Sequence, residues 1–207
     1  ALTTAPEANS QTVTKDGLRK TSEIASIVIP AGFMILLLVA VMTAGQYLLT
    51  TTIEEKGSRV MEVLLSAVSP MQLMVGKIVG QMGVGLLILV LYSGLGIVSL
   101  VAFSLEHLVH WTNVVYLLVF FLISFFLIAS FMAAIGSAVT ELREAQTLMT
   151  PVMAAMMVPW ILWMPISRAP NSTFSTVLSF VPGVNPFVMI IRLSGSEPVP
   201  TWQIPAS

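Results

Sequence analysis

Four long apolar stretches with almost no charged residues constrain this chain more than any other feature. The first runs from Ile24 to Ile53 without one charged residue, and its companions are Ile78 to Leu105, Val114 to Val139 and Leu148 to Ile166. A helix rises about 1.5 Å per residue, and a hydrocarbon core is about 30 Å thick. The lengths predict transmembrane helices over about 24–50, 74–103, 114–139 and 148–166. Prolines at 151, 159 and 165 are expected to bend or interrupt the fourth.

Composition supports a bilayer environment. Charged residues make up 9% of the chain and hydrophobic residues 56%, whereas a soluble domain carries about 25% charged residues. We therefore predict an all-α, polytopic helical membrane protein. A net charge of -1 argues against nucleic-acid binding, which needs basic patches. The absence of cysteine excludes disulfides and thiolate metal sites.

One short charged segment separates the first two apolar stretches. Read as a helix over about 54–66, it places Glu55 four residues before Arg59, and Arg59 three residues before Glu62. Valine, methionine and leucine side chains between the charges supply an apolar face. Two interpretations stay open for this amphipathic helix. It either seals the membrane interface, or it inserts its apolar face into a groove on a soluble partner.

The distribution of basic residues predicts the orientation. Lys56, Arg59 and Lys77 flank the first connection, Arg143 lies in the third, and the second has no Lys or Arg. By the positive-inside tendency, residues 54–70 and 141–146 are cytoplasmic and residues 106–113 are external. The polar start of the chain is then external although it is basic, with Lys15, Arg19 and Lys20. Long translocated regions follow the tendency poorly, so the start fits the tail of an extramembrane region.

The C-terminal part, residues 167–207, contains six prolines and one short apolar run, 186–191. This run is too short to cross a bilayer. We expect a re-entrant or interfacial helix within about 174–193.

Three smaller features carry alternatives. Gly76, Gly80 and Gly83 have a small-residue spacing that lets a helix approach closely, within this subunit or from a second one. The charged group Glu141, Arg143 and Glu144 is a solvated helix end or a second contact with a cytoplasmic partner. His107 and His110 stand three residues apart beside Glu106, but without further ligands nearby we expect an exposed loop and no metal.

The charged segment also carries a family resemblance. The run from Ile53 to Ser66, IEEKGSRVMEVLLS, followed by Val68-Ser69-Pro70 and Gly76-Lys77, resembles the first cytoplasmic segment of ABC transporter type-2 permeases, particularly sodium-efflux and drug-export permeases. Gly136, the Glu144-Ala145-Gln146 triplet, the helix prolines and the region from Pro182 to Phe187 resemble the later part of the same family. The resemblance covers roughly residues 20–195.

The resemblance implies a permease subunit with six transmembrane helices and an external domain after the first. By this comparison, residues 1–22 are the polar tail of an external domain, and residues 23–207 form the transmembrane permease domain. The first helix, most of the external domain and the sixth helix are then missing from the chain. Two permease subunits, identical or different, are expected to pair in a prokaryotic-type plasma membrane with two cytoplasmic ATP-binding subunits.

The family's coupling helix corresponds to residues 54–66. The resemblance makes Glu54, Glu55, Arg59 and Glu62 the residues expected to contact the ATPase. It also favours export over import. The sequence has no Walker phosphate loop, so ATP, Mg²⁺ and ATP hydrolysis are expected on the partner chain, and no cofactor is expected on this one.

Other classes remain as alternatives. A secondary transporter typically has ionisable residues at mid-membrane or paired broken helices, and neither pattern is visible here. An intramembrane enzyme needs a catalytic grouping, and no serine, histidine and acid constellation or HExxH motif occurs. A non-transporting membrane scaffold fits the apolar helices equally well. The substrate is not specified by any of these patterns.

Overall fold

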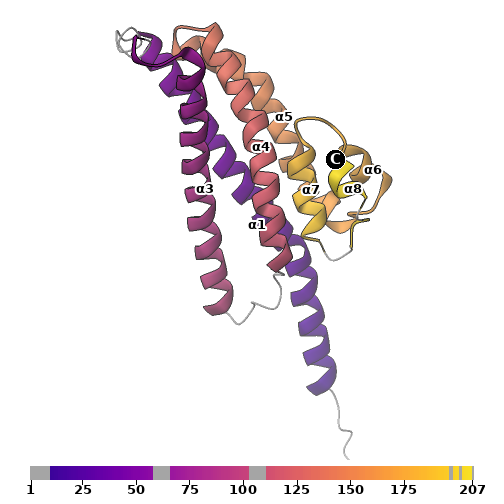
Figure 1. Cartoon of the computed structure of the whole chain (residues 1–207). Helices are drawn as coiled ribbons and strands as arrows, with labels where there is room; N and C mark the ends of the chain where they lie inside the picture. Colours follow the sequence, from indigo (N-terminus) through magenta and orange to yellow (C-terminus); the bar gives the residue numbers. More distant parts are fainter. Residues whose placement is uncertain (1–9, 58–65, 103–110, 196–197, 201, 207) are drawn as a thin grey trace, which may run out of the picture.

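The structure of the chain is a computed structural model that describes residues 10–57, 66–102, 111–195, 198–200 and 202–206. All the elements within these ranges are helices (Figure 1). The four long ones are α1 (Ser10–Gly57), α3 (Pro70–Ala102), α4 (Trp111–Ala138) and α5 (Leu142–Arg168). Each contains a window long and apolar enough to cross a membrane, the first of them over Ile27–Gly57. The predicted all-α, polytopic membrane fold is confirmed.

The first helix extends beyond the predicted range at both ends. It starts at Ser10, inside the region read as a polar tail, and it continues through Glu54 and Glu55 to Gly57. Pro30 lies inside α1 without ending it. Extending an existing helix costs little once its first turn is formed, so α1 does not have to stop where the apolar sequence stops. The start of the segment predicted as a separate coupling helix is therefore the end of α1, and residues 58–65 lie outside the described part.

The fourth long helix is also continuous. Pro151, Pro159 and Pro165 all lie within α5, which runs for 27 residues from Leu142 to Arg168. A proline inside a helix removes one backbone donor and disturbs the turn before it, but a neighbouring element that packs on the helix can hold it together. Pro159 is itself buried in this way.

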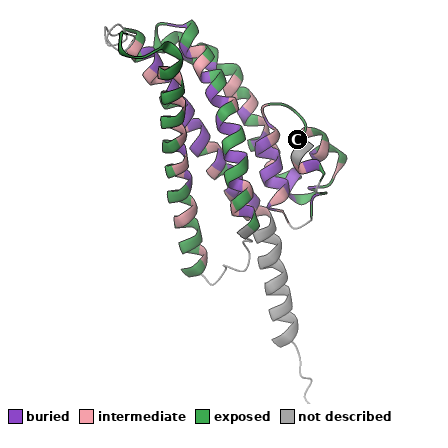
Figure 2. Cartoon of the chain, viewed as in Figure 1, coloured by how far each residue is buried: buried purple, intermediate pink, exposed green. Residues whose placement is uncertain are grey.

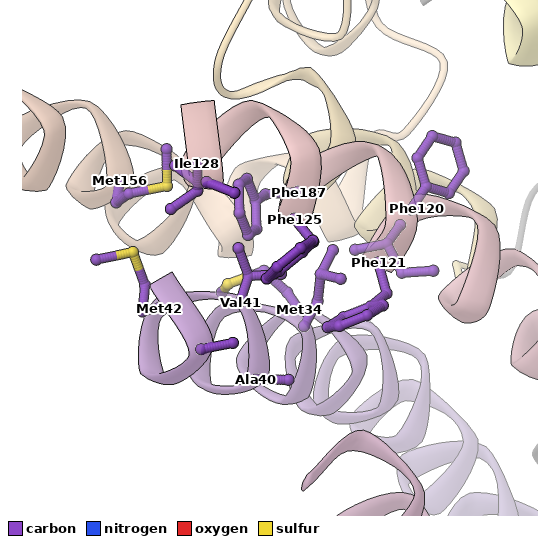
Figure 3. Close-up of a cluster of buried hydrophobic side chains, with 14 of the residues drawn as sticks. Met34, Ala40, Val41, Met42, Phe120, Phe121, Phe125, Ile128, Met156 and Phe187 are labelled. Atoms are coloured by element: carbon purple, nitrogen blue, oxygen red, sulfur yellow. The ribbon is translucent and has the colours of Figure 1, made fainter. Parts of the chain in front are cut away.

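Helix α1 is the centre of the bundle. It is contacted by α3, α4, α5 and the short helix α7 (Asn185–Leu193). The core contains Met34 and Val41 of α1, Phe125 of α4 and Phe187 of α7, which point towards one another (Figure 3). The Phe121 and Phe125 rings stack with their centroids 5.9 Å apart.

The C-terminal part folds into three short helices, α6 (Thr173–Leu178), α7 and α8 (Gln203–Ala206). The predicted segment 174–193 thus contains two helices, separated by a turn in which Gly183 has φ 96°, a conformation that favours glycine. Residues Pro186 to Arg192 of α7 are all buried, between α1, α4 and α5. This burial removes the apolar side chains of α7 from the surroundings of the bundle.

One end of the bundle gathers four helix ends. The C-terminal ends of α1 and α4 and the N-terminal ends of α3 and α5 lie at the upper end in Figure 1. We call this the charged end, and define it by Glu54, Glu55, Lys56, Lys77, Glu141, Arg143 and Glu144. The opposite end carries the C-terminal end of α3 and the N-terminal end of α4.

The outer surface is strongly apolar. On α3, Leu87, Leu95 and Val98 are exposed by 60% or more of their surface, and most of this helix is exposed (Figure 2). Such a face is unfavourable in water and favourable in hydrocarbon. This apolar outer surface is therefore suited to contact with lipid.

Candidate functional site

At the charged end, Lys56 closes the C-terminal end of α4. Its ammonium group donates hydrogen bonds to the backbone carbonyls of Gly136 at 2.9 Å, Ser137 at 2.5 Å and Val139 at 3.1 Å. The last carbonyls of a helix have no partner within the helix and form the negative end of its dipole. An ammonium has three donors, and here all three are used. Lys56 therefore caps a helix that lies 80 residues further along the chain.

An ion pair joins α1 to α3 at the same end. The Lys77 ammonium lies 2.5 Å from Oε2 of Glu55. Both side chains are partly shielded from solvent, with 12% of the Lys77 and 29% of the Glu55 side chain exposed. The last turn of α1 is thus linked to α3 through Glu55 and to α4 through Lys56.

The predicted contact residues divide into three groups. Glu54 and Glu55 lie in the last turn of α1, where Glu54 is exposed and Glu55 is paired with Lys77. Arg59 and Glu62 fall outside the described residues. The other predicted group, Glu141, Arg143 and Glu144, is exposed at the start of α5, with Glu141 in the N-cap position. The structure therefore brings Glu54 and Glu55 to the same end of the bundle as the charged residues at the start of α5.

Within the described part of this chain, close helix packing occurs at glycines other than the three predicted ones. A Cβ added at Gly76, Gly80 or Gly83 would meet no described atom within 4 Å, so this chain packs no described helix against them. Close approaches occur elsewhere. A Cβ at Gly85 would lie 2.7 Å from the Phe121 ring, and one at Gly136 would lie 3.3 Å from the Thr52 Cβ. A helix contact at Gly76, Gly80 or Gly83 stays a prediction. No described residue of this chain makes that contact, and a second subunit is the alternative that the sequence analysis named.

A polar cleft opens between α1 and α5, on the side of the charged end. It has a volume of about 390 Å³. Amide and hydroxyl side chains from both helices line it together with apolar ones: Gln46, Leu49, Thr50, Leu142, Ala145, Gln146, Met149, Thr150 and Met153. None of these lining residues is ionisable. Two other grooves of the bundle are lined almost wholly by apolar residues, so this cleft offers more polar partners than they do.

A second polar feature is Arg192, whose side chain is fully buried in the C-terminal part. Its guanidinium donates to the Pro170 carbonyl at 2.7 Å, to Ser179 Oγ at 2.7 Å and to Gln203 Oε1 at 2.7 Å, with longer bonds to Thr176 and Met189. All of these acceptors are neutral. Burial lowers the pKa of Arg192 because desolvation disfavours the charged form, yet a guanidinium stays charged at neutral pH. Arg192 thus links α7 to α6, to α8 and to the turn that follows α5.

The sequence analysis used Lys56 and Lys77 to assign orientation and within the family resemblance, and it gave no role to Arg192. Their roles depend on acceptors that are distant in sequence. The signal that points to Arg192 is its position directly after five apolar residues, since a charge in such a place has to find polar partners. The histidine pair, His107 and His110, lies outside the described residues. Within the described part, no group of three or more His, Asp or Glu side chains is placed to hold a metal ion.

Taken together, four apolar spans, a cluster of charged residues at one end of the bundle and a polar cleft between two spans describe a polytopic membrane protein. The chain belongs to the ABC-2 family transporter proteins, whose family model matches residues 1–207. The expected family is therefore confirmed, and with it a permease-type membrane transport subunit.

Two curated relatives carry no assigned function in their names. The chain is 30% identical to the uncharacterized protein YhaP of Bacillus subtilis, over 96% of the chain and 50% of that protein. It is 26% identical to the uncharacterized protein MJ1024 of Methanocaldococcus jannaschii, over 89% of the chain and 45% of that protein. The chain thus spans about half the length of these relatives. No solved structure matches it.

Proposed function

We propose that this chain is the membrane part of an ATP-driven exporter, and that a separate cytoplasmic ATP-binding subunit acts on its charged end. Membership of the ABC-2 family supports this proposal. The observation that carries it is that the charged C-terminal end of α1 and the charged N-terminal end of α5 lie at one end of the bundle. ATP and Mg²⁺ then belong to the partner, and two permease subunits complete the transporter in the cell membrane.

The coupling step is mechanical. Closure of the ATPase pair would move the segment that follows Gly57, and α1 and α3 would follow because Glu55 and Lys77 join them. The polar cleft lies at Gln46 to Thr50, about one to three turns before the last turn of α1. A displacement of α1 relative to α5 would change the width of this cleft, which we propose as part of the translocation path.

Substitution of Glu55 and Arg59 together by alanine tests the coupling step. We expect substrate-stimulated ATPase activity of the reconstituted transporter to fall at least several-fold, with membrane insertion intact. Because Glu55 also pairs with Lys77, Lys77→Met is compared with the double variant: it breaks the ion pair and leaves both proposed contact residues in place, so it measures the part of the loss that comes from the link between α1 and α3. Undiminished stimulation in the double variant would remove these residues from the ATPase contact.

A further inference from the structure

The last turns of α1 and α4 meet in an arrangement that needs a cation. Both helices run towards the charged end, so the negative ends of two helix dipoles lie side by side there. The Lys56 ammonium stands between them and takes three carbonyls of α4 as acceptors. Nearby, Gly136 allows the α4 backbone to approach Thr52 of α1, so closely that a Cβ added at Gly136 would lie 3.3 Å from the Thr52 Cβ.

We propose that Lys56 is a tether that makes the cytoplasmic ends of α1 and α4 move as one unit. Two of its acceptors are in the last turn of α4, and the third, the Val139 carbonyl, belongs to the turn that leads into α5. A force applied after Gly57 is thereby delivered to the turn before Glu141, Arg143 and Glu144. Lys56 is a positioning residue in this scheme, because its donors are occupied by backbone carbonyls.

The tether differs in kind from the Glu55–Lys77 ion pair. That pair joins α1 to α3 through two side chains, whereas Lys56 holds backbone atoms of α4, which have no rotamer freedom. The charge of Lys56 is also matched to the helix end, where a cation is stabilising and a neutral side chain leaves the carbonyls without these hydrogen bonds. Lys56→Met keeps most of the side-chain length and removes the donors and the charge.

The first test needs no transport activity. Hydrogen exchange of the full chain in detergent is followed in peptides that cover residues 133–145, for the unmodified protein, Lys56→Met, Lys56→Arg and Lys77→Met. Loss of a cation at a helix end raises the equilibrium constant for local unfolding of that end about five-fold. We therefore expect the exchange rate of residues 133–145 to rise about five-fold in Lys56→Met. Lys56→Arg should retain most of the protection, and Lys77→Met should leave this region unchanged. Equal exchange in Lys56→Met and the unmodified protein would overturn the tether.

The second test concerns movement as a unit, and it rests on the proposed function. The chain has no cysteine, so Thr52→Cys with Gly136→Cys creates a single thiol pair, at a Cβ separation within a few tenths of an ångström of that in disulfides. In the transporter reconstituted with its ATP-binding subunit, Lys56→Met should lower substrate-stimulated ATPase activity several-fold. The disulfide should restore the activity in that variant, and reduction should abolish the rescue.

The outcomes separate the two proposals. If the disulfide in the presence of Lys56 abolishes stimulation, the two helix ends must part during the cycle, and the unit is overturned. If the unmodified complex shows no stimulation by any compound, the proposed function fails. The hydrogen-exchange comparison still decides the tether in that case.

Discussion

At the scale of single residues, Arg192 is the charge in the described part of the chain with the most elaborate set of partners. Its guanidinium donates hydrogen bonds to neutral oxygens of the turn after α5, the C-cap residue of α6 and the start of α8. Removal of the side chain would leave several of these acceptors buried without a donor, which is expensive in a low-dielectric interior. The residue thus holds together a part of the molecule that has no long helix of its own.

We expect Arg192→Met to lower the stability of the purified protein by about 3 kcal/mol or more, since each unpaired buried acceptor costs about 1–3 kcal/mol. Arg192→Lys should recover little, because an ammonium has three donors and cannot reproduce the planar fork. Thermal unfolding in detergent measures the effect, and the exposed Arg168→Met is the control. A melting temperature for Arg192→Met close to that of the control would contradict the prediction.

Two glycines in α3 make a matched pair for a packing test. Gly85 is buried against the Phe121 ring and Ala44, whereas Gly83 lies two residues earlier with open space around it. Gly85→Ala should destabilise the protein by about 1–3 kcal/mol, because the added methyl group overpacks the contact between α1, α3 and α4. Gly83→Ala should be neutral or stabilising by up to about 1 kcal/mol, since alanine favours a helix. Equal melting temperatures for the two variants would show that the ring moves aside freely.

At the scale of elements, α1 combines several tasks in one uninterrupted helix. Its middle packs against the aromatic side chains of α4 and α7, its polar side chains Gln46 and Thr50 face α5 across the cleft, and its last turn carries the charged links. Because α1 is one continuous helix, a displacement of its last turn also moves the residues that line the cleft. The same helix therefore connects the proposed ATPase contact to the proposed path.

The polar cleft yields a prediction on substrate handling. Gln46→Leu together with Gln146→Leu removes both amides and keeps similar side-chain volume. If an uncharged polar or amphipathic molecule passes here, the double variant should transport it at least several-fold more slowly, while unstimulated ATPase activity of the complex stays the same. Gln72→Leu, on the exposed start of α3 outside the cleft, is the control. Unchanged transport in the double variant would exclude the cleft from the path.

At the scale of the whole molecule, α3 presents an extended apolar face to its surroundings. The predicted packing glycines, Gly76, Gly80 and Gly83, lie on this helix near the charged end and have no described neighbour within the chain. Lipid covers such a face in a lone subunit, and a second subunit covers part of it in the assembled transporter if the glycine prediction holds.

Cysteine cross-linking tests the subunit contact in native membranes. Gly80→Cys in the cysteine-free chain should give a disulfide-linked dimer on mild oxidation, because small residues at a helix contact bring two backbones close together. Leu95→Cys, on the exposed surface nearer the other end of α3, should give less dimer. If both positions give no dimer, or equal amounts, the glycines do not mark a subunit contact.

How much of this molecule follows from its sequence depends on the physical question. The length of each apolar run determined the number of spans, because hydrocarbon excludes charge and demands internally bonded backbone. The charged turns determined which helix ends lie at one surface. By contrast, only the tertiary structure shows which side chains of different helices lie next to one another. Helices α3 and α4 are apolar on every side, so their sequence pattern cannot show that Gly85 faces Phe121 while Gly83 faces outward. For the same reason, nothing near Lys56 in sequence reveals acceptors 80 residues away.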